Sequence, residues 1–531
     1  MERHGAGRQT AGMQRRIGIA AGIWGASILL SRLVGLVREA VIGRTLGGSA
    51  SADAYWTAFV LPDFLNYLLA GGALSIVFIP IFQRHLAAGE EERGWQAFGS
   101  ISSFLLVLLG CATIALWLFL PALAPLVAPG FTSEQQELLV HLSRILLPAQ
   151  IFHVLGGLCS AALQARDRHA VPALAPLVYT LGIVAGGLIT RSADGFAWGV
   201  LAGSFLGPFL LPLLACRGIG FRWRPRLSFA DPDLRTYLAR SLPIMLGFSI
   251  VVVDDWILRR EGTLLGTGSA SAITYAKNLM KVPMGIFGLA AGVAAYPTLA
   301  RLVAEGKPEE MRRTLWSTLR VMLVLAFAAQ ALLSVCGTEL AALVYGRGKL
   351  APDDLREIGG ALALCSIGLG AWSAQTVLAR GFYALGNTWL PALLGTIVAI
   401  AAYPLYVVLR GELGLGGLAL ASSAAILVYV ALLGWLLARD LERVCAPESA
   451  GLGLFFTRAL CALGLSIGAG RMLLRLLPEG FETGPLLLRA GLAGGVCLAV
   501  FAGVALLTGM PELQTILAPL RRRAGGGPTT N

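Results

Sequence analysis

The sequence predicts an all-α integral membrane protein with about fourteen transmembrane helices. Hydrophobic residues make up 56% of its 531 residues and charged residues only 14%, against about 25% in globular proteins. Apolar runs of about 20 residues recur along the chain, and a helix of that length crosses a hydrocarbon core about 30 Å thick. The mean hydropathy of +0.73 agrees with this class. The strict alternation that is typical of a transmembrane β-barrel does not occur in the sequence.

The predicted spans are bounded by charged or Gly/Pro-rich stretches. Arginine and lysine gather before the first span, in residues 217–226, around residues 301–313 and at 521–523. These segments fall on one side of the membrane if the number of spans is even, and cations are retained on the cytoplasmic side. Both termini are therefore predicted to be cytoplasmic. The spans begin near residues 18, 54, 98, 136, 170, 195, 236, 269, 315, 355, 388, 414, 453 and 485.

Two short matches indicate an internal duplication. GSASA occurs at residues 48–52 and again at 268–272, an offset of 220, and PAL occurs at 172–174 and at 391–393, an offset of 219. The agreement of the two offsets predicts that the first twelve spans are a duplicated set of six. Since each set holds an even number of spans, the repeat is parallel, an architecture typical of transporters that bind their substrate between two bundles.

The duplication predicts a division of the chain into segments. The last two spans lie outside the repeat and could form an added groove or fill out the bundle. The predicted segments are a basic cytoplasmic N-terminus (1–16), a six-helix bundle (17–218), a cytoplasmic linker (219–232), a second six-helix bundle (233–440), two additional transmembrane helices (441–511) and a cytoplasmic tail (512–531).

Composition and motifs argue against several other classes of protein. The net charge of +12 belongs to loops, because no soluble basic domain that would bind nucleic acid is predicted. The eight cysteines include no CxxC pair, and the sequence has no GxxxxGK[ST] stretch. Its five histidines form no visible constellation. We therefore expect no catalytic residues, no metal site, no cofactor and no enzymatic activity.

Charged residues inside the first span are the main functional signal. Arg32 lies about 15 residues into this span, which is about 22 Å from its start at a rise of 1.5 Å per residue. A charge at that depth is costly and is usually kept only where it faces protein or water. Glu39 follows seven residues later on the same helix face. Arg38 projects to a different side, and the simpler interpretation is that Arg38 and Glu39 solvate the end of the helix.

A second group of charges lies in the predicted seventh and eighth spans. Lys277 and Lys281 are two of only four lysines in the chain, and they lie one helical turn apart. Across a central cavity they could face Arg32, which would make that cavity cationic. The alternative is that each lysine anchors a helix end. Asp254 and Asp255 lie in the preceding span.

Five stretches carry a resemblance to a known family. They are SRLVGLVREAVIGRTLG (31–47), SADAYWTAFVLPDFL (51–65), ALSIVFIPIF (73–82), QARDRHAVPALAPLVY (164–179) and YAKNLMKVPMGIFGLAAG (275–292). In these stretches, and over nearly its whole length, the chain resembles the lipid II flippases of the MurJ/MviN family. That family belongs to the multidrug/oligosaccharidyl-lipid/polysaccharide exporter superfamily, and the chain resembles a divergent member.

The resemblance implies a cavity for the diphosphate of a polyprenyl-linked sugar. In the family, two first-helix arginines and an aspartate entering the second helix serve this cavity, and a guanidinium offers paired donors to phosphate oxygens. This chain departs from the family where Asn66 and Asn278 replace arginines, and the two lysines of the eighth span could restore the missing charge. The candidate substrate-binding residues are Arg32, Arg38, Asp53, Asn66, Lys277, Asn278 and Lys281.

The function implied is a flippase in cell-wall biogenesis. It would move undecaprenyl-diphosphate-linked saccharide, lipid II, from the inner to the outer leaflet of the bacterial cytoplasmic membrane by alternating access. We expect a monomer that contacts membrane lipid and uses a coupling ion or the membrane potential. The missing arginines leave open another polyprenyl-diphosphate oligosaccharide, such as an O-antigen, capsule or exopolysaccharide unit. Asp254 and Asp255 leave open a cation or drug antiporter, whereas short loops disfavour a membrane glycosyltransferase.

Overall fold

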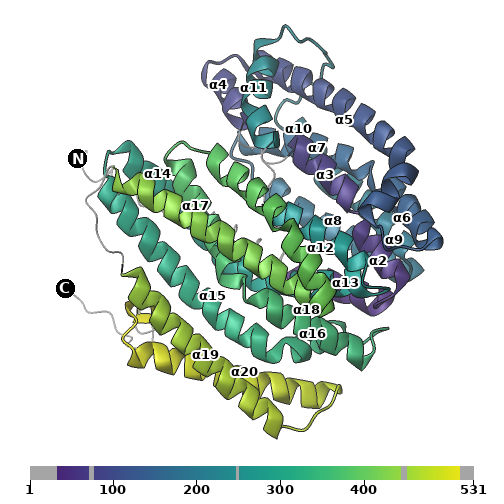
Figure 1. Ribbon diagram of the computed structural model, residues 1–531. Helices are drawn as coiled ribbons and strands as arrows, with labels where there is room; N and C mark the ends of the chain where they lie inside the picture. The colour runs from purple at the N-terminus through teal and green to yellow at the C-terminus, as the bar shows by residue number, and fades with distance from the viewer. Residues whose placement is uncertain (1–32, 71–76, 247–249, 444–450, 515–531) are drawn as a thin grey trace, which may run out of the picture. The chain divides into compact units, whose positions relative to one another are not determined.

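The structure is a computed structural model that describes residues 33–70, 77–246, 250–443 and 451–514. The described residues form helices and contain no strand, which confirms the predicted all-α class. Residues 33–46 are helical. In chain order the others are α2 (Ala50–Thr57), α3 (Val60–Ala70), α4 (Ile79–Ala87), α5 (Glu91–Val127), α6 (Ser133–Leu146), α7 (Ala149–Gln164), α8 (Ala170–Thr190), α9 (Ala193–Ser204), η2 (Phe205–Leu210), α10 (Leu211–Arg217), α11 (Pro232–Leu246), α12 (Ile250–Thr263), α13 (Ser269–Met284), η3 (Gly285–Leu289), α14 (Ala290–Ala304), α15 (Pro308–Tyr345), α16 (Pro352–Ser366), α17 (Leu369–Ala384), α18 (Trp389–Glu442), α19 (Leu452–Leu476) and α20 (Thr483–Leu507) (Figure 1).

The chain divides into two compact units. The first unit contains Ala58–Leu123 and Glu137–Leu246 together with the chain before Leu46, and the second contains Leu46–Thr57, Ala124–Gln136 and the chain after Leu246. Helix α2 thus belongs to the second unit, although it lies early in the sequence. The segment limits proposed from the duplication stay a prediction.

The order of helices repeats along the chain. Three pairs of helices begin at offsets of 217, 219 and 219 residues, close to the offsets of the repeated motifs. This agreement supports the predicted duplication. The pairs are α5 and α15, which begin at Glu91 and Pro308, α6 and α16, which begin at Ser133 and Pro352, and α8 and α18, which begin at Ala170 and Trp389.

The predicted number of membrane-crossing helices can be compared with the part of the chain that the structure describes. Within the described ranges, eight helices are long and apolar enough to cross a membrane, and the bent pair α16 and α17 brings the number to nine. The predicted count of about fourteen is therefore not confirmed. One reason is that α18 counts once although its 54 residues would extend about 80 Å as a straight helix.

Helix α18 folds back on itself. Its backbone leaves the helical region at Gly414, where φ is +57° and ψ is −132°. A Cβ atom on Gly417 would lie 1.8 Å from the carbonyl oxygen of Leu409, so the two legs of the helix approach closely at this turn. Both legs then pack against other helices of the second unit, and each contributes a side chain to the site described below.

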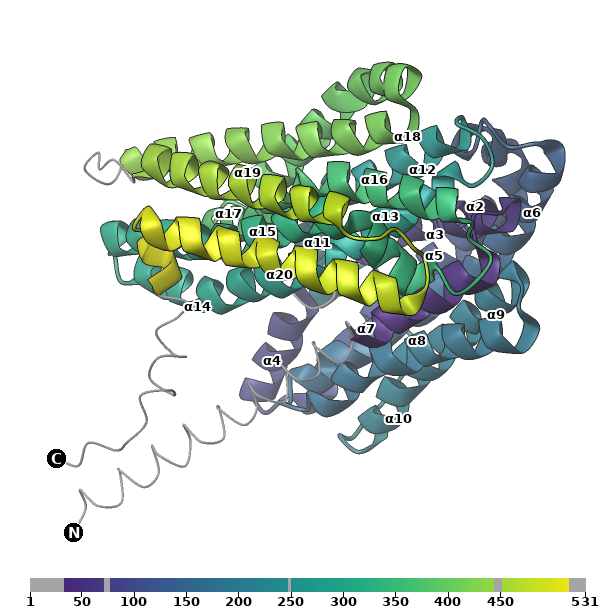
Figure 2. The same cartoon turned by 90° about the horizontal axis from the view of Figure 1, so that it is seen from below.

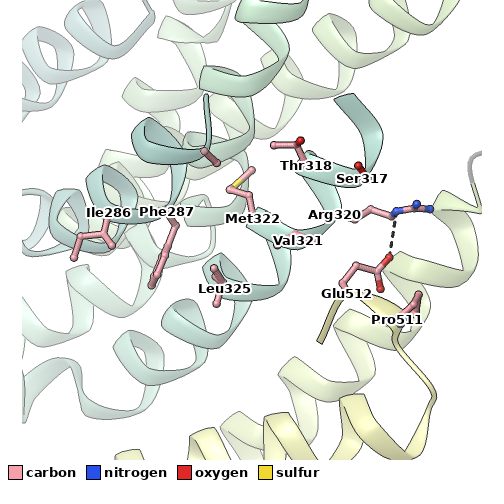
Figure 3. Close-up of a pocket in the computed structure, with 11 residues that line it drawn as sticks. Ile286, Phe287, Ser317, Thr318, Arg320, Val321, Met322, Leu325, Pro511 and Glu512 are labelled. Carbon is pink, nitrogen blue, oxygen red and sulfur yellow. Dashed lines mark ion pairs between the residues drawn. The ribbon is translucent and has the colours of Figure 1, made fainter. Parts of the chain in front are cut away.

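The last two helices pack against α15 in the second unit (Figures 1 and 2). The chain after α20 helps to line a cavity of about 540 Å³ whose other walls come from η3, α14 and α15 (Figure 3). Arg320 on α15 and Glu512 form an ion pair of 3.2 Å at its polar end, and Phe287, Met322 and Leu325 form part of its apolar wall. None of the predicted substrate-binding residues that the structure describes lines this cavity.

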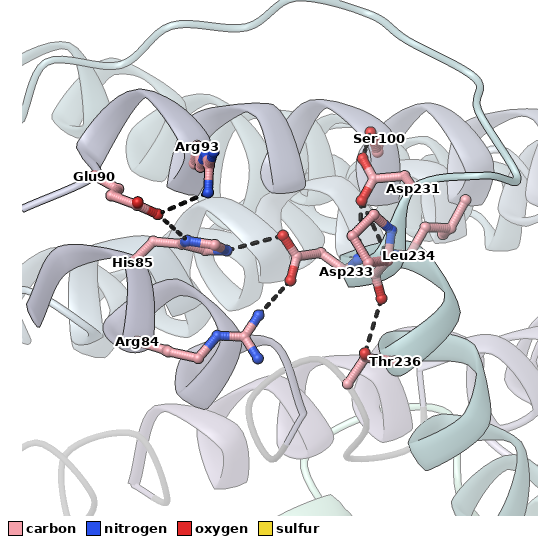
Figure 4. A network of polar contacts seen from close by, with 10 residues as sticks. Arg84, His85, Glu90, Arg93, Ser100, Asp231, Asp233, Leu234 and Thr236 are labelled. Atoms are coloured by element: carbon pink, nitrogen blue, oxygen red, sulfur yellow. Dashed lines mark hydrogen bonds and ion pairs between the residues drawn. The ribbon is translucent and has the colours of Figure 1, made fainter. Parts of the chain in front are cut away.

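In the first unit, polar contacts fasten the start of α11 to α4 and α5 (Figure 4). Asp233 accepts a hydrogen bond of 2.5 Å from Arg84 and lies 2.8 Å from Nε2 of His85. Ser100 on α5 donates a hydrogen bond of 2.5 Å to Asp231, whose other carboxylate oxygen accepts from the backbone amide of Asp233 at 2.9 Å. These contacts hold the last helix of the first unit to the helices beside it.

Helices α8 and α9 touch through their backbones. A Cβ atom on Gly186 would lie 2.2 Å from the carbonyl oxygen of Gly195, and one on Gly199 would lie 2.6 Å from that of Gly182. Glycine is therefore required here by space, because membrane helices associate closely where small residues face each other.

Replacement of Gly186 by alanine tests this contact. We expect Gly186→Ala to lower the stability of the protein by about 1–3 kcal/mol, because the added methyl group forces the helices apart. The measurement is the thermal unfolding midpoint of detergent-solubilised protein. The control is Gly110→Ala on α5, where a Cβ atom meets no atom within 4 Å. An equal effect of both substitutions would show that the close packing is not required.

Candidate functional site

Arg38 on the first helix is paired with the residue that follows it. Arg32 lies outside the described residues. Nη2 and Nε of Arg38 donate hydrogen bonds of 2.6 and 3.1 Å to Oε1 of Glu39. Neighbouring residues of a helix point in different directions, so the Arg38 side chain must bend to reach this carboxylate. The Arg38 side chain keeps 28% of its surface exposed and that of Glu39 keeps 8%.

Asp53 on α2 caps a helix far away in the sequence. Its Oδ2 accepts a hydrogen bond of 2.6 Å from the backbone amide of Gly268, and its Oδ1 accepts one of 2.7 Å from that of Ser271. These amides lie at the start of α13, where amides have no partner within the helix and where the helix dipole favours a negative charge. Asp53 is fully buried in this position. The described contacts therefore give it a structural function, and its contribution to the substrate cavity stays a prediction.

The two copies of the repeated motif contact each other in the second unit. Tyr275, seven residues after the start of the second copy, donates a hydrogen bond of 3.0 Å from its hydroxyl to the carbonyl oxygen of Gly47, directly before the first copy. A Cβ atom on Gly268 would lie 2.7 Å from the carbonyl oxygen of Gly48. The duplicated sequence thus forms a direct contact between α2 and α13.

Asn66 on α3 is held by an amide on α7. Its Nδ2 donates a hydrogen bond of 2.9 Å to Oε1 of Gln150, which is buried. Each amide keeps further donors and acceptors that can serve a polar ligand, but neither carries charge. This position therefore offers hydrogen bonds in place of the charge that an arginine would supply.

Lys277 on α13 is in contact with three buried side chains. Its ammonium group forms an ion pair with Asp254 on α12, donates a hydrogen bond of 2.8 Å to Ser422, and lies 4.2 Å from the centre of the Trp372 ring. Tyr406 and Ser422, one from each leg of α18, donate hydrogen bonds to the two carboxylate oxygens of Asp254. Because both charges are buried, the ion pair and these hydrogen bonds replace the hydration that the groups lose.

Lys281, one turn further along α13, has a more open environment. Its ammonium group donates a hydrogen bond of 2.6 Å to Asp255 on α12, and the two side chains are 27% and 19% exposed. Asp255, Lys281 and Asn278 line a small cavity of about 10 Å³, together with Arg259 and Lys277. This volume holds about one water molecule. Three of its lining side chains are basic and one is acidic, so the formal charge of the lining is positive.

The predicted residues are divided between the two units. Arg38 and Asn66 belong to the first, and the structure brings the lysines and the asparagine of α13 together at one cavity in the second. A cavity in which Arg32 faces the lysines stays a prediction. The predicted residues of the second unit are Asp53, Lys277, Asn278 and Lys281.

Several residues of the site were missed by reasoning from the sequence. Asp254 and Asp255 were noted, but as a reason to keep an antiporter open and not as partners of the two lysines. Ser422, Tyr406 and Trp372 gave no signal, because each lies about 100 residues or more from the lysine in the sequence and is of a type common in membrane helices. Two adjacent acids in one span and two lysines one turn apart in the next form a pattern that could have predicted the two ion pairs.

The fold and the site define a class of protein. Membrane-crossing helices in a repeated order, with ion-paired charges within them, are typical of secondary transporters. Comparison with known proteins narrows the class: the family model described as lipid II flippase MurJ matches residues 42–489. The chain belongs to the lipid II flippase MurJ family. This confirms the predicted family and the prediction of a transporter and not an enzyme, and it places the chain among multi-pass proteins of the inner membrane.

Curated relatives and solved structures agree with this assignment. A probable lipid II flippase MurJ of Vibrio cholerae is 27% identical over 77% of this chain and 80% of its own length. A probable lipid II flippase MurJ of Bdellovibrio bacteriovorus is 25% identical over 94% of this chain and 96% of its own length. In structure, the chain is similar to a lipid II flippase MurJ in an inward closed conformation, with a TM-score of 0.74, 19% identity and coverage of 94% of this chain and 100% of that one. It also resembles an inward-facing MATE family transporter of the MOP superfamily, with a TM-score of 0.66 and 14% identity. This match covers 79% of this chain and 96% of the transporter.

The buried pair of Lys277 and Asp254 allows a test by paired substitutions. We expect Lys277→Met to destabilise the protein by about 3–5 kcal/mol, because it leaves a buried carboxylate without its cation. The double variant Lys277→Met/Asp254→Asn should recover most of the loss, since the asparagine can keep its hydrogen bonds with Ser422 and Tyr406. The measurement is the thermal midpoint in detergent. A double variant no more stable than Lys277→Met would contradict the importance of the ion pair.

Proposed function

We propose that this chain is a flippase that moves lipid II, an undecaprenyl-diphosphate-linked saccharide, from the inner to the outer leaflet of the bacterial cytoplasmic membrane during cell-wall biogenesis. The match of the MurJ family model over residues 42–489 is the observation that carries the proposal. The cationic cavity between α12 and α13 supports it from the chemistry of the site, because a diphosphate needs fixed positive charge at membrane depth.

The basic side chains of the site differ in how they can bind a phosphate group. Arg38 offers a planar fork of donors that matches two phosphate oxygens at once, and Arg32 would act in the same way. Lys281 offers a point charge with three donors that can turn toward whichever oxygen is nearest. Asn66 and Asn278 add neutral donors suited to phosphate oxygens or sugar hydroxyls. Lys277, enclosed by Asp254, would mainly add to the positive potential of the cavity.

Alternating access is the proposed mechanism of movement. The chain has two compact units, and the repeated order of helices is that of transporters in which one bundle rocks against the other. In each half of such a cycle the substrate headgroup would leave one membrane surface and reach the other without crossing hydrocarbon. No covalent step and no cofactor is part of this cycle.

The remaining features of the proposal concern partners and topology. The chain would contact membrane lipid as well as its substrate, act as a monomer, and keep both termini in the cytoplasm. The membrane potential, worth about 2.3 kcal/mol per charge per 100 mV, or a coupling ion would drive the cycle. The basic segment around residues 301–313 supports the orientation, because cations are retained on the cytoplasmic side.

Export of another polyprenyl-diphosphate oligosaccharide is the second candidate. Asn66 and Asn278 favour it, because both are neutral where the family has arginine. The pairing of Asn66 with Gln150 makes the first unit richer in neutral hydrogen-bonding groups, which suits a headgroup with more sugar and less charge.

Replacement of Lys281, the partly exposed lysine of the cavity, tests the substrate site. We expect Lys281→Gln to reduce lipid II translocation in proteoliposomes by tenfold or more, since a hydrogen bond to a charged group contributes about 1.5–3 kcal/mol. The matched control is Lys307→Gln, in the segment between α14 and α15, where the lysine forms an ion pair of 3.0 Å with Glu305. The control should transport as the unchanged protein does.

Two results would contradict the proposal. Equal transport by Lys281→Gln and Lys307→Gln would remove Lys281 from the substrate site. A chain that cannot sustain cells depleted of their own lipid II flippase, but restores export of an O-antigen or capsule unit, would establish the second candidate in place of the first.

A further inference from the structure

Two lysine and aspartate pairs lie side by side between α12 and α13 but differ in the exposure of their side chains. The side chains of Lys277 and Asp254 are 4% and 2% exposed, whereas those of Lys281 and Asp255 are 27% and 19% exposed. Both pairs bring the ammonium group within hydrogen-bonding distance of the carboxylate. The difference is therefore one of environment and not of contact.

The environment determines how easily each pair can separate. Lys277 and Asp254 also hold Ser422, Tyr406 and the face of Trp372, so separating them would leave buried polar groups without partners. Lys281 and Asp255 are partly exposed, so an incoming anion can reach this lysine without unpairing the polar groups that surround Lys277. Asp255 can therefore leave Lys281 at little cost when another anion takes its place.

The cavity beside Lys281 has no room for such an anion while Asp255 stays in contact with it. Its volume is about 10 Å³, whereas ligand sites usually measure about 300–1,000 Å³. Carboxylate and phosphate oxygens form the same kind of charge-assisted hydrogen bond with an ammonium group. The Asp255 carboxylate thus forms with Lys281 the kind of contact that a phosphate group would form.

We propose that Asp255 is a placeholder anion: it neutralises Lys281 while the site is empty and is displaced by the diphosphate of the substrate. This inference rests on the proposed function. Asp255 is then a positioning residue that sets affinity, because the substrate must compete with a carboxylate of the protein. The competition also assists release, since Asp255 can return to Lys281 as the diphosphate departs. Transport requires binding that is favourable enough for entry and weak enough for exit.

A similar pair in the first unit supports the same principle. Glu39 contacts Arg38 at 2.6 Å, and the arginine keeps 28% of its side-chain surface exposed. In each unit, then, a partly exposed candidate cation is covered by a carboxylate adjacent in space. Neutral resting sites of this kind avoid an uncompensated charge within the membrane.

The test compares diphosphate binding by Asp255→Asn and by the unchanged chain. The probe is undecaprenyl diphosphate added to the full-length protein in detergent, with the dissociation constant measured by calorimetry. We expect Asp255→Asn to bind the probe at least about fivefold more tightly, which corresponds to about 1 kcal/mol. Release should slow in proportion, so lipid II translocation at saturating substrate should fall while its apparent KM decreases. Asp255→Glu, which restores the charge, should return the dissociation constant and the translocation rate toward those of the unchanged chain.

A matched control separates this effect from a change in net charge. Asp353→Asn removes an exposed carboxylate of the same unit that is paired at 2.6 Å with Arg356, and it should leave probe binding unchanged. The proposed role of Asp255 is overturned if the Asp255→Asn variant keeps the thermal midpoint of the unchanged chain and binds the probe no more tightly. A variant with a lowered midpoint and weaker binding would also overturn it, because Asp255 would then be a structural partner. Failure of the unchanged chain to bind the probe would contradict the proposed function itself.

Discussion

The pairing of cations with carboxylates inside apolar helices is the interaction on which the site depends. A lone charge at membrane depth costs several kcal/mol, and removing one partner of a buried pair leaves the other uncompensated. Lys277 meets this requirement with Asp254. Lys281, one turn further along α13, meets it with Asp255, the residue after Asp254 on α12. The helices can therefore carry the positive charge that a diphosphate needs without losing stability when no diphosphate is bound.

The buried charge of Asp53 on α2 is stabilised in a different way. Asp53 carries a buried negative charge that backbone amides at the start of α13 stabilise through hydrogen bonds and through the helix dipole. Because these donors belong to the backbone, this carboxylate is fixed in a way that a carboxylate facing a mobile ammonium is not. The contrast separates three acids of the second unit: Asp53 joins two helices, Asp254 holds a buried lysine in place, and Asp255 can exchange with another anion.

The sequence was sufficient for the class of fold, because apolar runs long enough to cross a membrane are a local property. It also singled out Lys277 and Lys281, since two of four lysines within one span are conspicuous. Contacts between distant segments could not be predicted in this way. Asp53 lies 215 residues before Gly268, and hydropathy does not report which helix an aspartate will cap. Separate spans were predicted to begin near residues 388 and 414, and the turn that divides α18 into two legs lies at Gly414.

The use of lysine at the exchangeable position has a physical reason of its own. A guanidinium bound by two parallel hydrogen bonds must lose both to change partner, whereas an ammonium has three equivalent donors and can turn from one oxygen to the next. Lys281 can thus pass from Asp255 to a phosphate through intermediate geometries in which at least one hydrogen bond is kept. The barrier to loading and release is lower for such a contact, although its geometric selectivity is also lower. In this chain, selectivity for the headgroup would therefore rest on the forked donors of Arg38 and the fixed amide of Asn66, and exchange would rest on Lys281.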